Sequence, residues 1–152
     1  MLRSLRQLLP NGFDSQAGNS RRMSAIRATK NKSTEARLRA WLARSAVRGW
    51  RLRPAGLPGK PDFLFPAERV VVFVDGCFWH GCPRCGNVPG KNRPYWSAKI
   101  AGNAERDGRN TARLREQGYR VLRLWEHELS ESPGDCVARL RDLLARADER
   151  SA

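Results

Sequence analysis

The fold is decided by residues 61 to 85, which read Pro61-Asp62-Phe63-Leu64-Phe65-Pro66-Ala67-Glu68-Arg69-Val70-Val71-Val72-Phe73-Val74-Asp75-Gly76-Cys77-Phe78-Trp79-His80-Gly81-Cys82-Pro83-Arg84-Cys85. Two apolar runs, 63–65 and 70–74, are separated by a turn, which predicts two adjacent strands. The second run is apolar throughout, as in a strand buried on both faces. A loop rich in Gly, Pro and Cys then covers 76–93, and its length indicates a function.

Working outward from this hairpin, turn and cap residues mark the other elements. Ser33 or Thr34 is the expected N-cap of a helix that Gly49 ends, and Pro94 opens a helix that stops at Gly118. The remaining expected elements are helices over 34–48, 94–117 and 133–147 and strands over 50–53 and 119–125. This order predicts an α/β fold with a central mixed β-sheet flanked by helices.

The charge of the chain is unevenly distributed. Residues 1–60 hold 14 Lys/Arg and two acidic residues, a net charge of +12, whereas residues 61–152 hold 15 Lys/Arg and 13 acidic residues, a net charge of +2. A basic arm beside a more neutral body suits a polyanionic partner. The alternative is a basic tail that is merely solvated.

The chain of 152 residues predicts one domain over 21–152, preceded by a flexible extension over 1–20. Met23 is a second possible start of translation. No apolar run approaches the ~20 residues of a membrane span, and no signal peptide is evident at the N-terminus. We therefore expect a soluble, cytoplasmic protein.

Two carboxylates and a histidine suggest hydrolytic chemistry. Asp62 precedes one strand and Asp75 ends the next, so antiparallel pairing brings both to one sheet edge, where they can hold a hard divalent cation. His80 can take a proton from water near neutral pH. In the alternative, Asp62 caps a turn and Asp75 faces water.

The cysteines suggest a second, softer metal. Cys77, Cys82 and Cys85 lie within nine residues, where only two could pair, so zinc is favoured over disulfides. The fourth ligand is His127 or Cys136, and His127 is preferred because the neighbours of Cys136 look like a core helix face. Cysteines acting as small core residues do not suit a loop of Gly, Pro and Arg.

Several segments closely resemble the Vsr very-short-patch-repair endonucleases, in collinear order from about residue 21 to 129. They are Met23-Ser24-Ala25-Ile26-Arg27, Leu57-Pro58-Gly59-Lys60-Pro61-Asp62-Phe63, Val74-Asp75-Gly76-Cys77-Phe78-Trp79-His80-Gly81-Cys82-Pro83, Asn103-Ala104-Glu105-Arg106-Asp107 and Arg120-Val121-Leu122-Arg123-Leu124-Trp125-Glu126-His127. The resemblance implies a restriction-endonuclease-like, PD-(D/E)xK core. It also implies Mg²⁺-dependent nicking of DNA 5′ to the thymine of a T:G mismatch, which arises when 5-methylcytosine deaminates.

The resemblance also implies roles for individual residues. Asp62 and the carbonyl of Val74 are implied Mg²⁺ ligands, with Asp75 a possible further one. His80 is the implied general base, Asp107 the carboxylate that orients it, and Glu35 an acidic support. The implied zinc ligands are Cys77, Cys82, Cys85 and His127. The implied DNA wedge consists of Phe78, Trp79, Trp96 and, from the opposite groove, Met23.

The basic arm over 21–32 is expected to contact phosphates through Arg21, Arg22, Arg27, Lys30 and Lys32. The sequence departs from the family at Val74-Asp75, where some members carry Thr-His. It departs from the related nuclease pattern at Cys77, where a lysine is usual, so His80 must serve proton transfer.

The expected substrate is double-stranded DNA with a T:G mismatch, cut by a monomer associated with the nucleoid. A MutL-type repair protein and a cytosine-5 methyltransferase are possible partners. Two other functions stay open: a restriction-type endonuclease on the same core, and a zinc-stabilised DNA-binding module without activity.

Overall fold

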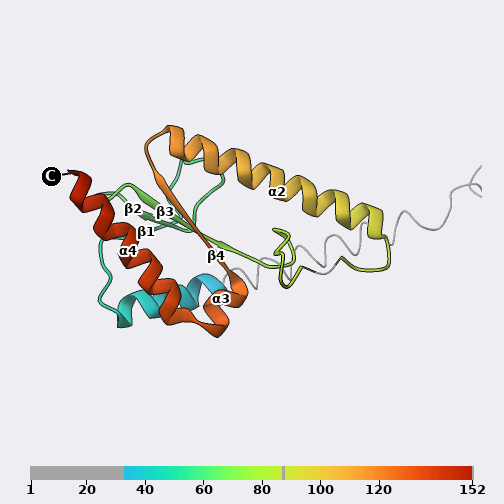
Figure 1. The fold of residues 1–152 in the computed structure, drawn as a ribbon, viewed down its shortest axis with the longest axis horizontal. Coiled ribbons are helices and arrows are strands. Elements are labelled where there is room, and N and C mark those ends of the chain that lie inside the picture. The colour runs from blue at the N-terminus through green and yellow to red at the C-terminus, as the bar shows by residue number, and fades with distance from the viewer. Residues whose placement is uncertain (1–32, 87, 152) are drawn as a thin grey trace, which may run out of the picture.

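The computed structural model describes residues 33–86 and 88–151, which form a four-stranded mixed sheet with helices on both faces (Figure 1). The strands are β1 (Arg51–Leu52), β2 (Phe63–Phe65), β3 (Val70–Asp75) and β4 (Arg120–Trp125), in the order β1-β2-β3-β4. The pairs β1–β2 and β2–β3 are antiparallel, and β3–β4 is parallel. The mixed α/β sheet predicted from the sequence is therefore confirmed.

Helices cover the sheet on its two faces. One face carries α2 (Arg93–Glu116), and the other carries α3 (Glu126–Glu131), α4 (Pro133–Ser151) and the helical segment 33–44 (Figure 1). α2 connects β3 to β4 across the sheet, the kind of crossover that a parallel strand pair requires. No helix in the described part of the chain has the length and apolar character needed to cross a membrane.

Alternation along β3 divides the core into two layers, because successive side chains of a strand point to opposite faces. Val70 and Val72 pack with Leu38 and Leu42 of the first helical segment and with residues of α3 and α4. Val71 and Phe73 pack with Leu114 of α2. All six residues of β3 are buried, as the unbroken apolar run predicts.

The first helical segment is shorter than expected. Its helical residues end at 44, and the chain leaves through a Schellman turn, with Val47 N–H donating to the Leu42 carbonyl and Ala46 N–H to the Ala43 carbonyl. Ala46, with φ 56°, takes the left-handed position that the sequence analysis gave to Gly49. The predicted end at residue 48 was wrong because a glycine is the usual, but not the required, residue there.

Two further elements differ from expectation. The short helix α3 was not predicted, and α4 continues to Ser151 rather than 147. The strands near 50–53, 63–65, 70–74 and 119–125 and the helix near 94–117 were correctly placed to within about two residues at their ends.

Candidate active site and metal centre

The parallel pairing of β3 and β4 places the functional residues at one edge of the sheet. Asp75 and Trp125 are register partners at the ends of the two strands. The cysteine loop leaves β3 at this edge, and α3 leaves β4 beside it. Residues that are far apart in the sequence therefore meet at the edge.

Asp62 lies at the start of β2, opposite the C-terminal end of β3. Its Oδ2 accepts a hydrogen bond of 2.7 Å from the backbone N–H of Val74. Burial is the main cause that raises the pKa of Asp62 to about 6, and the negative charges of Glu35 and Asp75 raise this pKa further. The hydrogen bond from Val74 opposes the shift. A half-buried carboxylate with acidic neighbours is an attractive position for a cation.

Asp75 has a different environment, because an arginine is aimed at it. Arg123 Nη1 lies 3.0 Å from each of the two carboxylate oxygens of Asp75. The Asp75 side chain is 6% exposed and the Arg123 side chain 23%. Burial raises the pKa of Asp75, although Arg123 and His80 both oppose that shift.

His80 pairs with Asp107 of α2. The His80 Nδ1 to Asp107 Oδ2 distance is 2.5 Å, and Nδ1 lies 3.9 Å from Asp75 Oδ1. Partial burial favours a higher pKa for Asp107, but the hydrogen bond and charge of His80, together with Arg123, hold that pKa below its usual value. Since Nδ1 is turned to a carboxylate, Nε2 is the ring nitrogen that can accept a proton.

Asp75, His80 and Asp107 line a cavity of about 320 Å³, and Asp62 lies outside its lining. Its lining residues are Asp75, His80, Ala104, Asp107, Gly108, Thr111, Arg115, Arg123 and Trp125. The cavity therefore joins the ends of β3 and β4 to the middle of α2, and the His80–Asp107 pair stands on its wall.

Glu35 lies on the first helical segment, on the opposite side of the sheet from α2. Its buried carboxylate accepts hydrogen bonds of 3.0–3.2 Å from the Arg53 guanidinium. It is close enough to repel a negative charge on Asp62. The structure thus brings Glu35 near Asp62 but also gives it a cationic partner that the sequence analysis had not identified.

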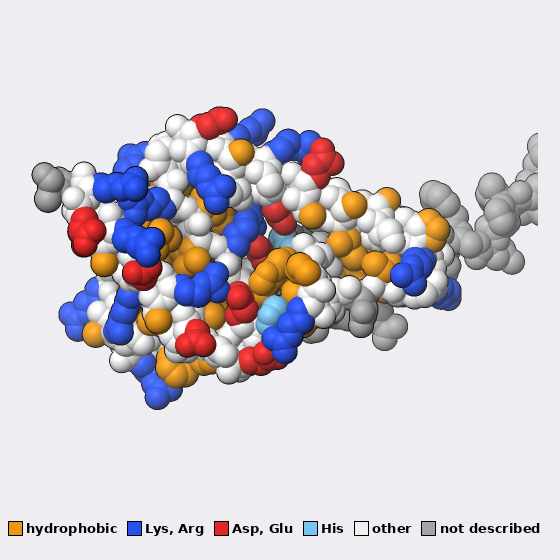
Figure 2. All heavy atoms as spheres, viewed as in Figure 1, with side chains coloured by type: hydrophobic (Ala, Val, Ile, Leu, Met, Phe, Trp, Pro, Cys, Tyr) orange, Lys and Arg blue, Asp and Glu red, His pale blue; other side chains and the backbone are white. Residues whose placement is uncertain are grey.

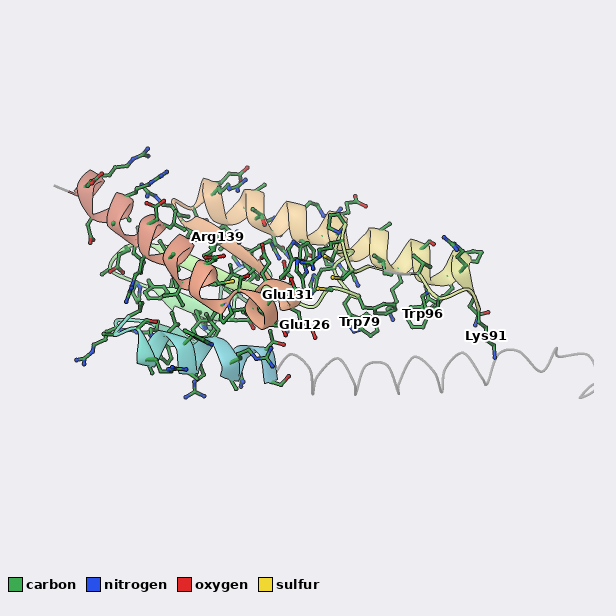
Figure 3. The ribbon with its side chains drawn as sticks, turned by 60° about the horizontal axis from the view of Figure 1, so that its bottom comes forward. Trp79, Lys91, Trp96, Glu126, Glu131 and Arg139 are labelled. Atoms are coloured by element: carbon green, nitrogen blue, oxygen red, sulfur yellow. The ribbon has the colours of Figure 1, made fainter. Side chains whose placement is uncertain are left out.

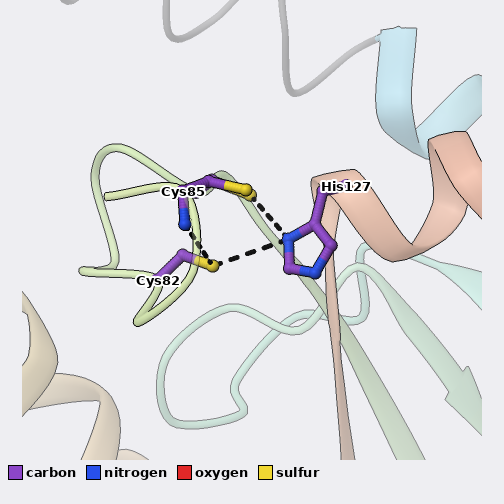
Figure 4. Close-up of side chains that lie close together, drawn as sticks. Cys82, Cys85 and His127 are labelled. Atoms are coloured by element: carbon purple, nitrogen blue, oxygen red, sulfur yellow. Dashed lines mark hydrogen bonds between the residues drawn. The ribbon is translucent and has the colours of Figure 1, made fainter. Parts of the chain in front are cut away.

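The second centre is formed by Cys77, Cys82, Cys85 and His127, whose ligand atoms all lie within 4.8 Å of one another. His127 Nδ1 is 3.3 Å from Cys77 Sγ and 3.5 Å from Cys82 Sγ. Figure 4 shows His127 turned from the start of α3 toward the cysteine loop. Tetrahedral zinc requires about 3.5 Å between sulfur and nitrogen ligands, so this group could bind a metal with little rearrangement.

The geometry of the loop and the charges of its thiols favour an ion. Cys82 Sγ accepts the backbone N–H of Cys85 at 3.4 Å. Gly86 lets the chain turn closely over Cys82, since a Cβ there would lie 2.5 Å from the Cys82 carbonyl oxygen. Burial and the neighbouring sulfurs of Cys82 and Cys85 raise the pKa of the Cys77 thiol to about 12. Cys77 would therefore be a thiolate near neutral pH only with a cation beside it.

Cys136, the alternative fourth ligand, lies in the core with Val137 and Leu140 of α4. It is not a member of the four-residue group, in which His127 takes the fourth place.

The aromatic side chains of the loop and α2 form a cluster. Phe78, Trp79 and Trp96 pack in edge-to-face pairs, with centroids 5.2–6.0 Å apart. Figure 3 shows Trp79 and Trp96 on the same side of α2. Trp79 and Trp96 are each 6% exposed, so Phe78, which is half-buried, is the more accessible of the three.

Polar residues of α2 complete the cluster. The Lys99 ammonium lies 5.6–5.8 Å from the ring centroids of Trp79, Tyr95 and Trp96, and Asn103 Nδ2 donates to the Trp79 carbonyl at 3.0 Å. Lys99 was not predicted from the sequence. Its spacing of three and four residues from Trp96 and Tyr95 was the available signal.

The structure thus connects most of the residues singled out in the sequence. Asp62, Val74, Asp75, His80 and Asp107 form one neighbourhood, and the Cys/His group joins the cysteine loop that follows β3 to the start of α3. Met23 and the basic residues Arg21, Arg22, Arg27, Lys30 and Lys32 lie outside the described residues. Arg123 was missed, although a charge within an apolar strand was a visible signal.

Comparison with known proteins agrees with this arrangement. The family model described as DNA mismatch endonuclease Vsr matches residues 13–85. The Type II nicking enzyme V.NaeI of Lentzea aerocolonigenes is 45% identical over 132 residues, covering 84% of this chain and 77% of the relative. The DNA mismatch endonuclease Vsr of Escherichia coli (strain K12) is 42% identical over 113 residues, covering 73% of this chain and 70% of the relative.

The Type II nicking enzyme V.XorIIP of Xanthomonas oryzae pv. oryzae (strain KACC10331 / KXO85) is 44% identical over 124 residues, covering 80% of this chain and 88% of the relative. The fold, the site and these relatives define the class of protein as a DNA endonuclease. Within that class, the chain belongs to the Vsr family of DNA mismatch endonucleases.

Proposed function

We propose that this protein is a Mg²⁺-dependent endonuclease that nicks one DNA strand 5′ to the thymine of a T:G mismatch. The observation that carries the proposal is the meeting of Asp62 with the His80–Asp107 pair at one sheet edge. Membership of the Vsr family supplies the mismatch as substrate. We also propose that the mixed sheet is a PD-(D/E)xK core, because such a core carries metal-binding carboxylates at strand ends, where Asp62 and Asp75 lie.

In the proposed site, Asp62 and the backbone carbonyl of Val74 hold Mg²⁺. The donor set fits a hard cation, since both ligands are oxygens and the Asp62 carboxylate is half-buried beside other acids. When bound, the metal would stabilise negative charge on the reacting phosphate. Glu35 would add to the negative potential around Asp62.

His80 is the proposed general base. Asp107 Oδ2 lies 2.5 Å from His80 Nδ1 and holds that side of the imidazole. His80 Nε2 is therefore left to take a proton from a water molecule as the water oxygen attacks phosphorus. The bond from phosphorus to the 3′ oxygen breaks with its electron pair on that oxygen, which takes a proton from solvent, so the products are a 5′-phosphate and a 3′-hydroxyl. Asp107 keeps the ring oriented and stabilises it once it is protonated.

The Cys77, Cys82, Cys85 and His127 group is proposed to hold a structural zinc. Four soft or borderline ligands leave no open coordination position, as in other closed zinc sites. Phe78 and Trp79 lie between the zinc ligands Cys77 and Cys82. A zinc-pinned loop would therefore hold both rings rigidly against Trp96, with the half-buried Phe78 presented for insertion beside a weakened base step and Trp79, 6% exposed, supporting it.

The segment 21–32 is proposed as a DNA-binding arm, with Arg21, Arg22, Arg27, Lys30 and Lys32 on phosphates and Met23 near the mismatch. Its support is the +12 net charge of residues 1–60. Action as a monomer, with a MutL-type protein and a cytosine-5 methyltransferase as functional partners, is proposed on family membership alone.

The test is a single-turnover nicking assay on matched T:G and T:A duplexes with varied flanking sequence. We expect a nick 5′ to the thymine of T:G only, dependent on Mg²⁺. Asp62→Ala and His80→Ala should each lower the rate at least about 100-fold with mismatch binding kept within about threefold. Equal cutting of T:A duplexes would instead indicate a restriction-type enzyme, and normal nicking by Asp62→Ala would refute the metal assignment.

A further inference from the structure

Arg123 connects three elements at the active-site edge. It projects from the middle of β4, where Phe73 of β3 is its register partner, and its guanidinium lies 4.0 Å over the Phe73 ring. Nη1 lies 3.0 Å from both oxygens of Asp75. Nε donates to Thr111 Oγ1 at 3.0 Å, and Nη2 donates to the Asp107 carbonyl oxygen at 3.3 Å.

The two α2 residues that Arg123 binds fall on the same face of that helix. Asp107 and Thr111 are four residues apart, so they lie about one helical turn from each other on the same face. An arginine that binds both fixes the rotation of α2 relative to β4, because its fork of donors is rigid. The Asp107 carboxylate, whose Oδ1 lies 3.9 Å from Nη1, is turned toward His80 in that arrangement.

Asp75 completes the arrangement from β3. A partly buried guanidinium is costly unless it is paired, and the Asp75 side chain, 6% exposed, supplies the opposite charge. Both Asp75 oxygens are engaged by Arg123. A metal ion at Asp75 would have to displace or share the guanidinium of Arg123. Among the described residues, no Lys or Arg side chain is hydrogen-bonded to Asp62, which accepts the N–H of Val74.

We propose that Arg123 is a positioning residue for the nicking reaction: it holds Asp107, and through it His80, in place, and Asp75 is its internal counter-ion rather than a metal ligand. This inference rests on the proposed function for its kinetic consequence, but the arrangement itself can be measured without DNA. It gives the Val74-Asp75 departure from the family pattern a physical role.

The experiment compares the purified full-length protein with four variants. Arg123→Met removes the charge and keeps an unbranched stem over Phe73. Arg123→Lys keeps the charge without the fork, and Asp75→Asn removes the counter-ion charge. Arg120→Met is the matched control, since it removes an arginine from the same strand at a distance from the cavity.

The first measurement is NMR of the imidazole nitrogens. The chain has two histidines, so the His80 signal is resolved beside that of His127, which serves as an internal reference. We expect a downfield Nδ1 proton for His80, hydrogen-bonded to Asp107, in the unaltered protein and in Arg120→Met, and a weakened one in Arg123→Lys, which lacks the fork. We expect it to disappear or to be exchange-broadened in Arg123→Met, with His127 unchanged.

The second measurement is nicking under single-turnover conditions. Arg123→Met should lower the rate at saturating DNA about 10-fold to 100-fold, with the dissociation constant for DNA changed by less than about threefold. Arg123→Lys, which keeps the charge but loses the fork, should recover only part of that rate. Asp75→Asn should leave the half-saturating Mg²⁺ concentration within about twofold, since removal of a true ligand would raise it much more.

An unchanged His80 signal and rate in Arg123→Met would overturn the proposal. So would a large rise in the Mg²⁺ requirement of Asp75→Asn, which would make Asp75 a ligand. If Arg123→Met does not fold, Arg123→Lys decides, since a rate and signal identical to the unaltered protein would show that the fork is not needed. Absence of nicking by the unaltered protein would refute the proposed function and leave the imidazole signal to decide the role of Arg123.

Discussion

Asp62 and Asp75 belong to one hairpin, yet the fold gives the two carboxylates opposite neighbours. Asp75 faces the guanidinium of Arg123 at 3.0 Å. Asp62 accepts one backbone N–H and is repelled by Glu35 and Asp75. Because burial disfavours a lone carboxylate, Asp62 is the position where an added cation would gain most.

This difference predicts how stability depends on pH. The pKa of Asp62 is raised from 3.8 to about 6 in the folded protein, so the folded state binds the proton more tightly than the unfolded state. The stabilisation of the folded state by the proton on Asp62 is complete below pH 3.8 and disappears as the pH rises through 6. In Mg²⁺-free buffer, the free energy of unfolding relative to Asp62→Asn should fall by roughly 1 kcal/mol between about pH 5 and about pH 8.

Urea denaturation of the two proteins at both pH values makes the measurement, with all other titrating groups held in common. Added Mg²⁺ at about pH 8 should stabilise the unaltered protein and leave Asp62→Asn unchanged. A constant difference between the two proteins across this pH range would contradict the raised pKa.

At the scale of elements, a single parallel pairing assembles both centres. Cys77 and His127 each lie two residues beyond the register partners Asp75 and Trp125, so the two strands deliver them to the same place. An ion pair between Arg84 of the loop and Glu131 of α3, at 2.7 Å, adds a second link; Figure 3 labels Glu131 on α3. Both side chains are largely exposed, so this link contributes little by itself.

The loop should therefore depend on its metal. Purified protein should contain about one zinc per chain. Cys82→Ala should lose the zinc and lower the Tm by more than about 10 °C, because zinc binding supplies folding energy directly. The matched control is Cys136→Ala, which removes a buried thiol of α4 that is outside the group of four.

Metal analysis and thermal unfolding of both variants make the comparison. Cys136→Ala should keep its zinc and lower the Tm by only the few degrees expected of a small core truncation. A folded, active preparation of the unaltered protein without zinc would contradict the assignment.

At the scale of the whole molecule, apolar side chains are concentrated in one region of the face shown in Figure 2, whereas charges of both signs and other apolar side chains are mixed over the rest of it. On the face shown in Figure 2, Lys and Arg side chains are scattered over the sheet and α4, whereas apolar side chains gather over the loop and the adjoining part of α2. The excess charge of the chain lies in residues 1–60.

Two truncations test whether the N-terminal charge contributes to binding. Deleting residues 1–20 should matter little, and deleting residues 1–32 should weaken binding and reduce the preference for T:G. For every phosphate that the truncated protein no longer neutralises, the slope of log K against log salt should flatten by roughly 0.9. Titrations at several salt concentrations measure the slope, and the same slope in the longer truncation and the full chain would show that the arm does not bind phosphates.

The sequence by itself determined the elements that have strong local signals. The unbroken apolar run of β3 required burial on both faces, and Pro94 and Gly118 marked the limits of α2. It also indicated three cysteines of the possible metal group, because their spacing lets them meet within one loop, whereas the fourth place stayed open between His127 and Cys136 until the pairing of β3 with β4 brought His127 to the loop. The end of the first helical segment was misplaced because Ala46 adopts a conformation that only its surroundings select.

The tertiary structure alone decided which charges are paired. Asp62 and Asp75 are equivalent in the sequence as carboxylates at strand ends, and only the crossover through α2, which brings β4 back beside β3, places Arg123 against Asp75. The same crossover brings Asp107 to His80 across 27 positions of the chain. A local pattern fixes which side chains can titrate or bind, but the energy of a buried charge depends on its neighbours in space, and the packing of the sheet chooses those neighbours.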